Sequence, residues 1–264
     1  MAGGFGSLLG LGGGVLIVPL LTLGFGLPLR EAVGVSLICV IMTSSAAAGV
    51  YLERHVANLR LGMTLELFTA FGALLGGSIA FLLSEQLLSL LFAGLLLYVA
   101  VMMARGERAE PALDPDALVS DAFDTDPATP QTSLERLSGE GYRVRNLGRG
   151  VVGATGAGLA SALLGIGGGI IKVPLMHLAM GVPLRVATAT SNLMIGITAA
   201  ASAVIYLLRG EIDPYVAGPT AIGVFLGASL GSRLAPRINL RWLQLAFIVV
   251  LGITAIQMLL RAFP

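Results

Sequence analysis

Eight long apolar stretches occupy most of this 264-residue chain. Most of them approach the roughly 20 residues that an α-helix needs to cross the hydrocarbon core of a bilayer. They cover residues 5–25, 31–52, 61–83, 86–104, 148–180, 184–208, 214–234 and 240–261. Only 12% of the residues are charged, whereas a soluble domain carries about 25%. The sequence therefore predicts an all-α polytopic membrane protein embedded in a lipid bilayer.

A polar segment divides the apolar stretches into two groups. Residues 106–147 begin with an acidic, proline-rich run and end with a basic run around Arg143 and Arg145. This composition is typical of a flexible linker or a small surface loop. We expect a first membrane repeat over residues 1–105, a cytoplasmic linker over residues 106–147 and a second membrane repeat over residues 148–264.

The two groups repeat each other. The run "LLGLGGGVLIVPL" at Leu8–Leu20 returns as "LLGIGGGIIKVPL" at Leu163–Leu175, 155 positions later. The same offset continues without a gap over about 75 positions, through "LPLREA" and "VPLRVA" to "GALLGG" and "GASLGS". Such a register indicates duplication. Paired membrane repeats are typical of transporters whose site lies between the halves.

The fifth apolar stretch is too long for one crossing. As a single helix, residues 150–181 would measure roughly 48 Å at 1.5 Å per residue, more than the roughly 30 Å of hydrocarbon. Consecutive glycines interrupt helices, so we expect a re-entrant hairpin folded at Gly165–Gly169. Each repeat would then contain one glycine-broken, re-entrant segment and about three transmembrane helices.

The arginines bear on the orientation of the repeats, because cytoplasmic loops collect lysine and arginine. Eight full crossings would leave five arginines on the side away from the linker. If the first and fifth stretches are re-entrant, only Arg30, Arg209 and Arg261 remain there. This sharper bias favours inverted repeats, with the linker inside the cell and both termini outside.

The glycine motifs are candidates for an anion site. Broken backbone at membrane depth survives only where protein buries it or where it lines a wet cavity, and its free N–H groups suit an anion. The alternative is close helix packing through small residues. The candidate residues are Gly12, Gly13, Gly14, Gly167, Gly168 and Gly169. Neither copy has the spacing of a nucleotide-binding motif.

Lys172 is the only lysine in the chain and lies inside the second motif, where the first has Ile17. A cation within the membrane is costly and is by default a functional candidate. Beside exposed amides it would add positive charge to an anion site. The alternative is that its ammonium group reaches the membrane surface from near a helix end.

Hydroxyl and amide side chains follow each motif. Ser36 corresponds to Ser191, whereas Thr190 and Asn192 occur in the second copy only. These groups could complete an oxyanion site, or they could hydrogen-bond neighbouring helices. His177 lies five residues after Lys172 and could relay protons or serve structure alone.

Other classes of function find little support. Glu66 lies near the start of the third apolar stretch and could be interfacial or couple transport to protons; we favour the membrane interface. The single cysteine, Cys39, excludes a disulfide framework and a cysteine-based metal site. The two histidines are far apart and no acidic cluster accompanies them, so we expect no enzyme, no metal and no cofactor. A net charge of +1 gives no reason to expect a nucleic-acid partner.

The ordered set "LLGIGGGIIKVPL", "ATATS", "YLLRGEIDP" and "GASLGSRLA" resembles the TauE/SafE family, also called the toluene sulfonate uptake permease family. The resemblance covers nearly the whole chain outside the linker. It implies a permease for sulfur-containing anions such as sulfite, sulfoacetate and other organosulfonates, in the inner membrane of a bacterium or archaeon.

A permease of this kind would work by alternating access around a midplane site shared by both repeats. An interior-negative potential pushes anions out by about 2.3 kcal/mol per charge per 100 mV. Export therefore needs no coupling ion, and no carboxylate pair for binding one is visible, so the sequence favours export. An anion channel and a transporter for small carboxylates are the alternatives. A homodimer is a further expectation.

Overall fold

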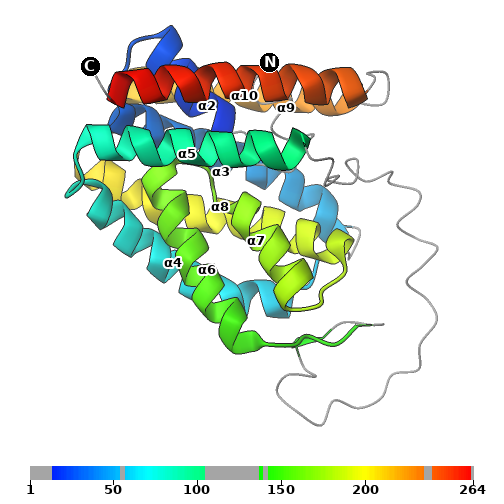
Figure 1. The fold of residues 1–264 in the computed structure, drawn as a ribbon. Coiled ribbons are helices and arrows are strands. Elements are labelled where there is room, and N and C mark those ends of the chain that lie inside the picture. Colours follow the sequence, from blue (N-terminus) through cyan, green and yellow to red (C-terminus); the bar gives the residue numbers. More distant parts are fainter. Residues whose placement is uncertain (1–13, 54–56, 105–136, 139–141, 235–239, 263–264) are drawn as a thin grey trace.

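The computed structural model describes residues 14–53, 57–104, 137–138, 142–234 and 240–262. The elements in these ranges are helical, which confirms the all-α class for the described part of the chain (Figure 1). They are α2 (Gly14–Pro19), η1 (Leu20–Gly24), α3 (Leu29–Glu53), α4 (Leu59–Ala80), α5 (Glu85–Ala104), α6 (Leu147–Leu164), α7 (Gly169–Pro174), η3 (Leu175–Ala179), α8 (Leu184–Leu208), α9 (Pro214–Leu234) and α10 (Leu240–Ala262). Most of the expected linker lies outside the described residues.

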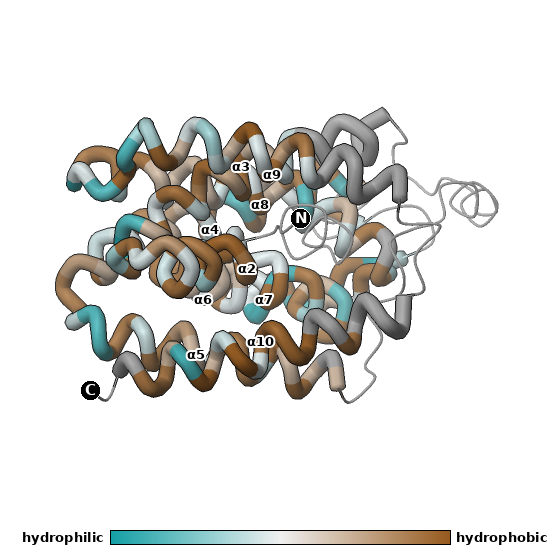
Figure 2. Tube along the Cα trace, turned by 90° about the horizontal axis from the view of Figure 1, so that it is seen from above, coloured by the Kyte–Doolittle hydropathy of each residue, from teal (hydrophilic) through white to brown (hydrophobic). Residues whose placement is uncertain are grey.

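Within the part of the chain that the structure describes, four helices are long and apolar enough to cross a membrane by length and composition. They cover Leu59–Ala80, Glu85–Met102, Leu147–Leu164 and Val186–Leu208. Hydrophobic residues also face outward, since Leu67, Leu97 and Ile256 are each more than half exposed. Figure 2 shows hydrophobic residues along much of α5 and α10. An exterior this apolar suits contact with lipid.

The second glycine motif reverses the chain. Helix α6 ends at Leu164, and α7 begins at Gly169. Between them, Gly165, Gly167 and Gly168 have a positive φ. Glycine adopts this backbone conformation without steric cost. The two legs then lie side by side, because the N–H of Arg145 donates to the carbonyl of Met180 over 3.0 Å. The predicted fold at Gly165–Gly169 is thus a hairpin.

A proline follows each motif, and a π-helical turn follows each proline. Pro19 ends α2 before η1, and Pro174 ends α7 before η3. Proline has no N–H to donate, so the regular ladder is interrupted and the turn widens. The hydroxyl of Thr22 donates to the carbonyl of Val18 over 3.0 Å, which satisfies an acceptor near the interruption.

The main helix packing joins the first half of the chain to the second. Helix α3 packs antiparallel on α8, with Gly34 beside Tyr206 and Ser44 beside Gly196. Helix α5 packs on α10, which runs in the opposite direction (Figure 1). Helix α4 packs on both α6 and α8. The two halves of the chain therefore interleave.

The packing of α4 on α6 is backbone to backbone. A Cβ atom added at Gly72 would lie 2.1 Å from the carbonyl oxygen of Thr155. One added at Gly158 would lie 1.9 Å from the carbonyl oxygen of Thr69. Small residues at a crossing let membrane helices approach closely. This close approach packs the first leg of the hairpin directly against α4.

Candidate anion site between the two halves

Lys172 lies on α7, the returning leg of the hairpin, and only 1% of its surface is exposed. Its Nζ lies 3.3 Å from Oε2 of Glu66 on α4 and also donates to the hydroxyl of Thr198 on α8. The hydroxyl of Thr198 in turn lies 2.6 Å from Oε1 of Glu66. We call Lys172, Glu66 and Thr198 the buried triad. It is the place where α4, α7 and α8 meet.

The buried triad joins both halves of the chain through opposite charges. Glu66 is 4% exposed and Thr198 is fully buried, so water is excluded from the ion pair. Removing two charges from water costs free energy. The attraction between them offsets that cost only when their geometry and hydrogen bonds are good. Such a pair adds little stability over apolar residues of the same size. Its presence therefore points to a role other than stability.

Glu66, which we expected at the membrane interface, is buried between helices. Helix α4 begins at Leu59, so Glu66 lies about two turns inside it, on the face that meets the hairpin and α8. Local sequence could not reveal this contact, because 106 positions separate Glu66 from Lys172. The one available signal was the need of a lone buried lysine for a counter-ion.

The glycine motifs of the two halves meet. A Cβ atom added at Gly14 would lie 2.3 Å from the carbonyl oxygen of Gly165 and 3.0 Å from Cα of Ile166. The hydroxyl of Ser36 donates to the same carbonyl of Gly165 over 2.8 Å. Ser36 therefore holds the hairpin tip in place. Gly12 and Gly13 lie outside the described residues.

The remaining glycines of the second motif pack tightly. A Cβ atom at Gly167 would lie 2.6 Å from Cγ2 of Ile195 and 2.8 Å from Cγ1 of Val40. One at Gly168 would lie 3.5 Å from Cε of Lys172. The carbonyl of Gly168 accepts from the N–H of Lys172, so it closes the first turn of α7. Gly169 is the first residue of that helix.

Two buried hydroxyls lack a hydrogen-bond partner among the described residues, those of Ser161 and Ser191. Ser161 is close to the triad, because its Cβ and Cε of Lys172 both lie within 3.5 Å of the Cβ position at Gly168. Buried hydroxyls normally have partners, so each is open to a ligand. Ser191 belongs to the predicted set. Ser161 was missed, because it sits among small residues of α6 that resemble packing positions.

Two of the predicted polar residues make structural contacts. The hydroxyl of Thr190 accepts from the N–H of Asn58 over 2.9 Å, at the start of α4. The amide of Asn192 donates to the carbonyl of Thr188, and the carbonyl of Asn192 accepts from the hydroxyl of Ser44. These bonds tie α8 to α4 and α3.

His177 lies away from the buried triad. Its ring is exposed, and Nδ1 lies 2.9 Å from the carbonyl oxygen of Val182 in the turn after η3. This contact stabilises the turn between η3 and α8. Within the described residues no group of three or more metal-ligating side chains is found.

A family model described as "Sulfite exporter TauE/SafE" matches residues 1–258. The chain belongs to this family. It is 24% identical over 266 residues to the probable membrane transporter protein YunE of Bacillus subtilis, covering 98% of this chain and 94% of the relative. It is 26% identical to a probable membrane transporter protein of Methanocaldococcus jannaschii, over 98% and 92% of the two chains. No solved structure matches it.

A plant relative matches a shorter segment of this TauE/SafE chain. "Sulfite exporter TauE/SafE family protein 6" of Arabidopsis thaliana is 35% identical over 95 residues, which are 36% of this chain and 22% of the relative. Together with the apolar helices, the family match makes the chain a multi-pass membrane protein of a transporter family.

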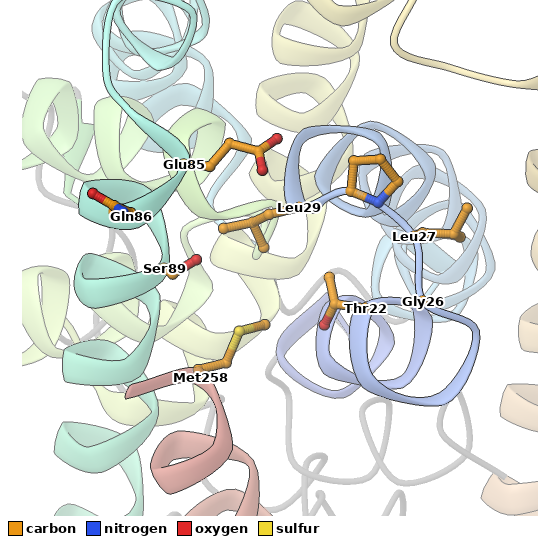
Figure 3. Close-up of a pocket in the computed structure, with 9 residues that line it drawn as sticks. Thr22, Gly26, Leu27, Leu29, Glu85, Gln86, Ser89 and Met258 are labelled. Carbon is orange, nitrogen blue, oxygen red and sulfur yellow. The ribbon is translucent and has the colours of Figure 1, made fainter. Parts of the chain in front are cut away.

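The TauE/SafE chain also has a cavity of about 370 Å³ at the junction of η1, α3, α5 and α10. Figure 3 shows Glu85, Ser89 and Met258 on one side of this cavity and Thr22 and Leu27 on the other. Among the described residues that line it, the charged one is the acidic Glu85. A negative lining disfavours an anion, so this cavity is a weaker candidate than the buried triad.

Proposed function

We propose that the protein is a permease that moves small sulfur-containing oxyanions across the inner membrane. Sulfite, sulfoacetate and other organosulfonates are the proposed substrates. The observation that carries the proposal is the buried ammonium group of Lys172, which a hairpin holds between the two halves. A buried cation in a membrane protein typically marks a substrate pathway. The sulfur atom of the substrate rests on the family description.

The proposed binding groups come from the hairpin and from α8. Lys172 supplies the positive charge, and the hydroxyls of Ser161 and Ser191 supply unused donors. The backbone of Gly167–Gly169 forms the wall next to Lys172. Hydrogen bonds that involve charged groups are roughly twice as strong as neutral ones, so one ammonium with several donors can hold an oxyanion.

The other predicted site residues take supporting parts in this proposal. Ser36, Thr190 and Asn192 hold the hairpin tip and α8 through the contacts described above. Gly14 brings the first half against the tip, and Gly12 and Gly13 precede it in the chain. The proton-relay role of His177 stays a prediction.

The proposed mechanism is alternating access by two inverted repeats. Corresponding helices begin 155 positions apart, since α3 begins at Leu29 and α8 at Leu184, and α5 at Glu85 and α10 at Leu240. The members of each pair run in opposite directions (Figure 1). Opposite directions are what an inverted duplication requires. In this proposal the halves rock around the buried triad.

The carboxylate of Glu66 affects the expected direction of transport. The preference for export rested on the lack of a visible carboxylate that could bind a coupling ion. Glu66 supplies a carboxylate 3.3 Å from Lys172. Uptake is therefore as compatible with the site as export, and only a flux measurement in both directions decides between them.

A flux screen in proteoliposomes tests the proposal. We expect saturable transport of at least one anion among sulfite, sulfoacetate, taurine and thiosulfate, and slower transport of acetate. Acetate preferred over every sulfur anion would favour a carboxylate transporter. Unsaturable flux above about a million ions per second would indicate a channel, because typical turnover by binding and release is far slower.

The variant Lys172→Met tests the site itself. We expect it to abolish transport, whereas Ile17→Met, at the corresponding position of the first half, should leave transport close to wild type. Loss of Lys172 leaves Glu66 buried and unpaired, which is costly. The double variant Lys172→Met with Glu66→Gln removes both charges and should fold, but it should still not transport. Normal flux in either Lys172 variant would remove Lys172 from the pathway.

A further inference from the structure

We propose that Glu66 binds a proton that travels with the substrate, so that an anion occupies Lys172 only when one proton has neutralised Glu66. This inference rests on the proposed function and names its coupling ion. It follows from the way in which the buried triad satisfies its own charges.

Both oxygens of the Glu66 carboxylate are occupied. Oε2 accepts from Lys172 over 3.3 Å, and Oε1 accepts from Thr198 over 2.6 Å. The ammonium group of Lys172 in turn has its counter-ion and the hydroxyl of Thr198. The triad is therefore neutral and closed, with Lys172 only 1% exposed. An incoming anion must share Lys172 with Glu66 or displace it.

Pairing one ammonium group with both an anion and the Glu66 carboxylate is energetically unfavourable. Two negative charges in one water-excluded site repel strongly, and such pairs resolve the repulsion by binding a proton to one member. A proton on Glu66 turns the carboxylate into a neutral acid, which can still bond Thr198. The ammonium group is then free to pair with the anion, and the neutral charge of the site is restored.

The proton balance follows directly. One proton enters from the same aqueous phase as the anion and binds a carboxylate oxygen of Glu66. It leaves as the anion leaves, and the Lys172 to Glu66 ion pair forms again. No covalent bond of the substrate changes. A monovalent anion therefore moves with no net charge, and a divalent anion moves with one net negative charge.

No other described group can replace Glu66 in this role. The charge that acts on Glu66 is that of Lys172, and Thr198 is its hydrogen-bond partner. Other titratable or charged side chains described on the helices packed around the triad are exposed or bonded elsewhere. These are Arg60 on α4, Arg149 on α6 and His177 on η3, which are exposed, and Tyr206 on α8, which bonds the carbonyl of Ala162.

The place that the duplication relates to the triad takes one residue from each half and lacks both charges. Positions 155 residues away from Lys172 and Glu66 carry Ile17 and Ala221, both buried. One chain therefore offers one such proton site. This sets the expected stoichiometry at one proton per anion.

The test uses the purified full chain in proteoliposomes, with methanesulfonate as the probe because its charge stays at −1 across the pH range. The membrane potential is held at zero with potassium and valinomycin, and a trapped pH indicator reports proton entry. With the interior one pH unit more alkaline, we expect wild type to accumulate methanesulfonate about tenfold, with one proton per anion. Anion entry without proton entry would overturn the proposal.

The variant Glu66→Gln provides the second arm, because glutamine mimics the protonated acid. We expect it to exchange methanesulfonate at a rate that no longer depends on pH, and to lose the tenfold accumulation. Proton-driven accumulation by Glu66→Gln would overturn the proposal. If this variant does not fold, the proton count on wild type still decides. Failure of wild type to move any sulfur oxyanion would instead overturn the proposed function.

Discussion

Thr198 links the two charged side chains of the buried triad. Its hydroxyl contacts both Lys172 and Glu66, and it also lies 3.0 Å from the carbonyl oxygen of Met194 in its own helix. A residue that bonds both members of a buried ion pair fixes their distance and their orientation. The stability of the triad should therefore depend on this hydroxyl.

Replacing Thr198 by valine should lower the free energy of unfolding by about 1–3 kcal/mol, because buried charged groups lose a hydrogen-bond partner. Thr198→Ser keeps the hydroxyl and should stay closer to wild type. Thermal unfolding in detergent measures both variants. Equal stability of the valine and serine variants would contradict the bonding role of Thr198.

The tip glycine Gly167 should resist substitution more than another glycine of the same backbone conformation. Gly167 and Gly210 both have a φ of +74°, but only at Gly167 would a Cβ atom meet side chains, those of Ile195 and Val40. We expect Gly167→Ala to cost about 1–3 kcal/mol more than Gly210→Ala, the usual cost of overpacking. Equal losses of stability would show that the tip is loosely packed.

At the scale of the helices, the crossing of α4 and α6 depends on glycine. Gly158 has no room for a Cβ atom beside Thr69, whereas a Cβ atom at Gly156, on the same helix, would meet nothing within 4 Å. Gly158→Ala should therefore lower the unfolding temperature, and Gly156→Ala should leave it unchanged or raise it slightly. A harmless Gly158→Ala variant would contradict the close crossing.

The helices and the hairpin could be predicted from local sequence. The length of an apolar run predicts a helix, and consecutive glycines predict where it is broken, so both signals lie within a single segment. Lys172 could be singled out because it is a lone cation in an apolar run. The contacts of the site could not be predicted. Glu66 meets Lys172, and Ser36 meets Gly165, only because helices from distant parts of the chain pack with particular faces together. One sequence without relatives carries no signal of such pairing.

At the scale of the whole molecule, the positions of the helix ends predict on which side of the membrane the linker and the C-terminus lie. Met258 near the end of α10 lines the same cavity as Glu85 at the start of α5. The linker follows the other end of α5, and the second leg of the hairpin returns to the start of α6, which follows the linker. The linker and the C-terminus should therefore face opposite sides of the membrane.

Single cysteines in a Cys39→Ala background test this orientation. We expect an impermeant thiol reagent to label a cysteine added after Pro264 in intact cells and to leave a cysteine at Ser120 in the linker unlabelled. Disrupting the membrane should expose the linker cysteine, which confirms that it is reactive. Labelling of both sites, or of the linker alone, in intact cells would contradict the inverted arrangement.

The interleaving of the two halves has a consequence for biosynthesis. The main partners of α3, α4 and α5 are α8, α6 and α10, all of which are made after the linker. Ribosomes add about 5–20 residues per second, so the first helices wait for about 4–30 s before their partners are complete. During that time Lys172, the ion-pair partner of Glu66, has not yet been made. Maturation of this protein is therefore an assembly of inserted helices, completed only after the last one leaves the ribosome.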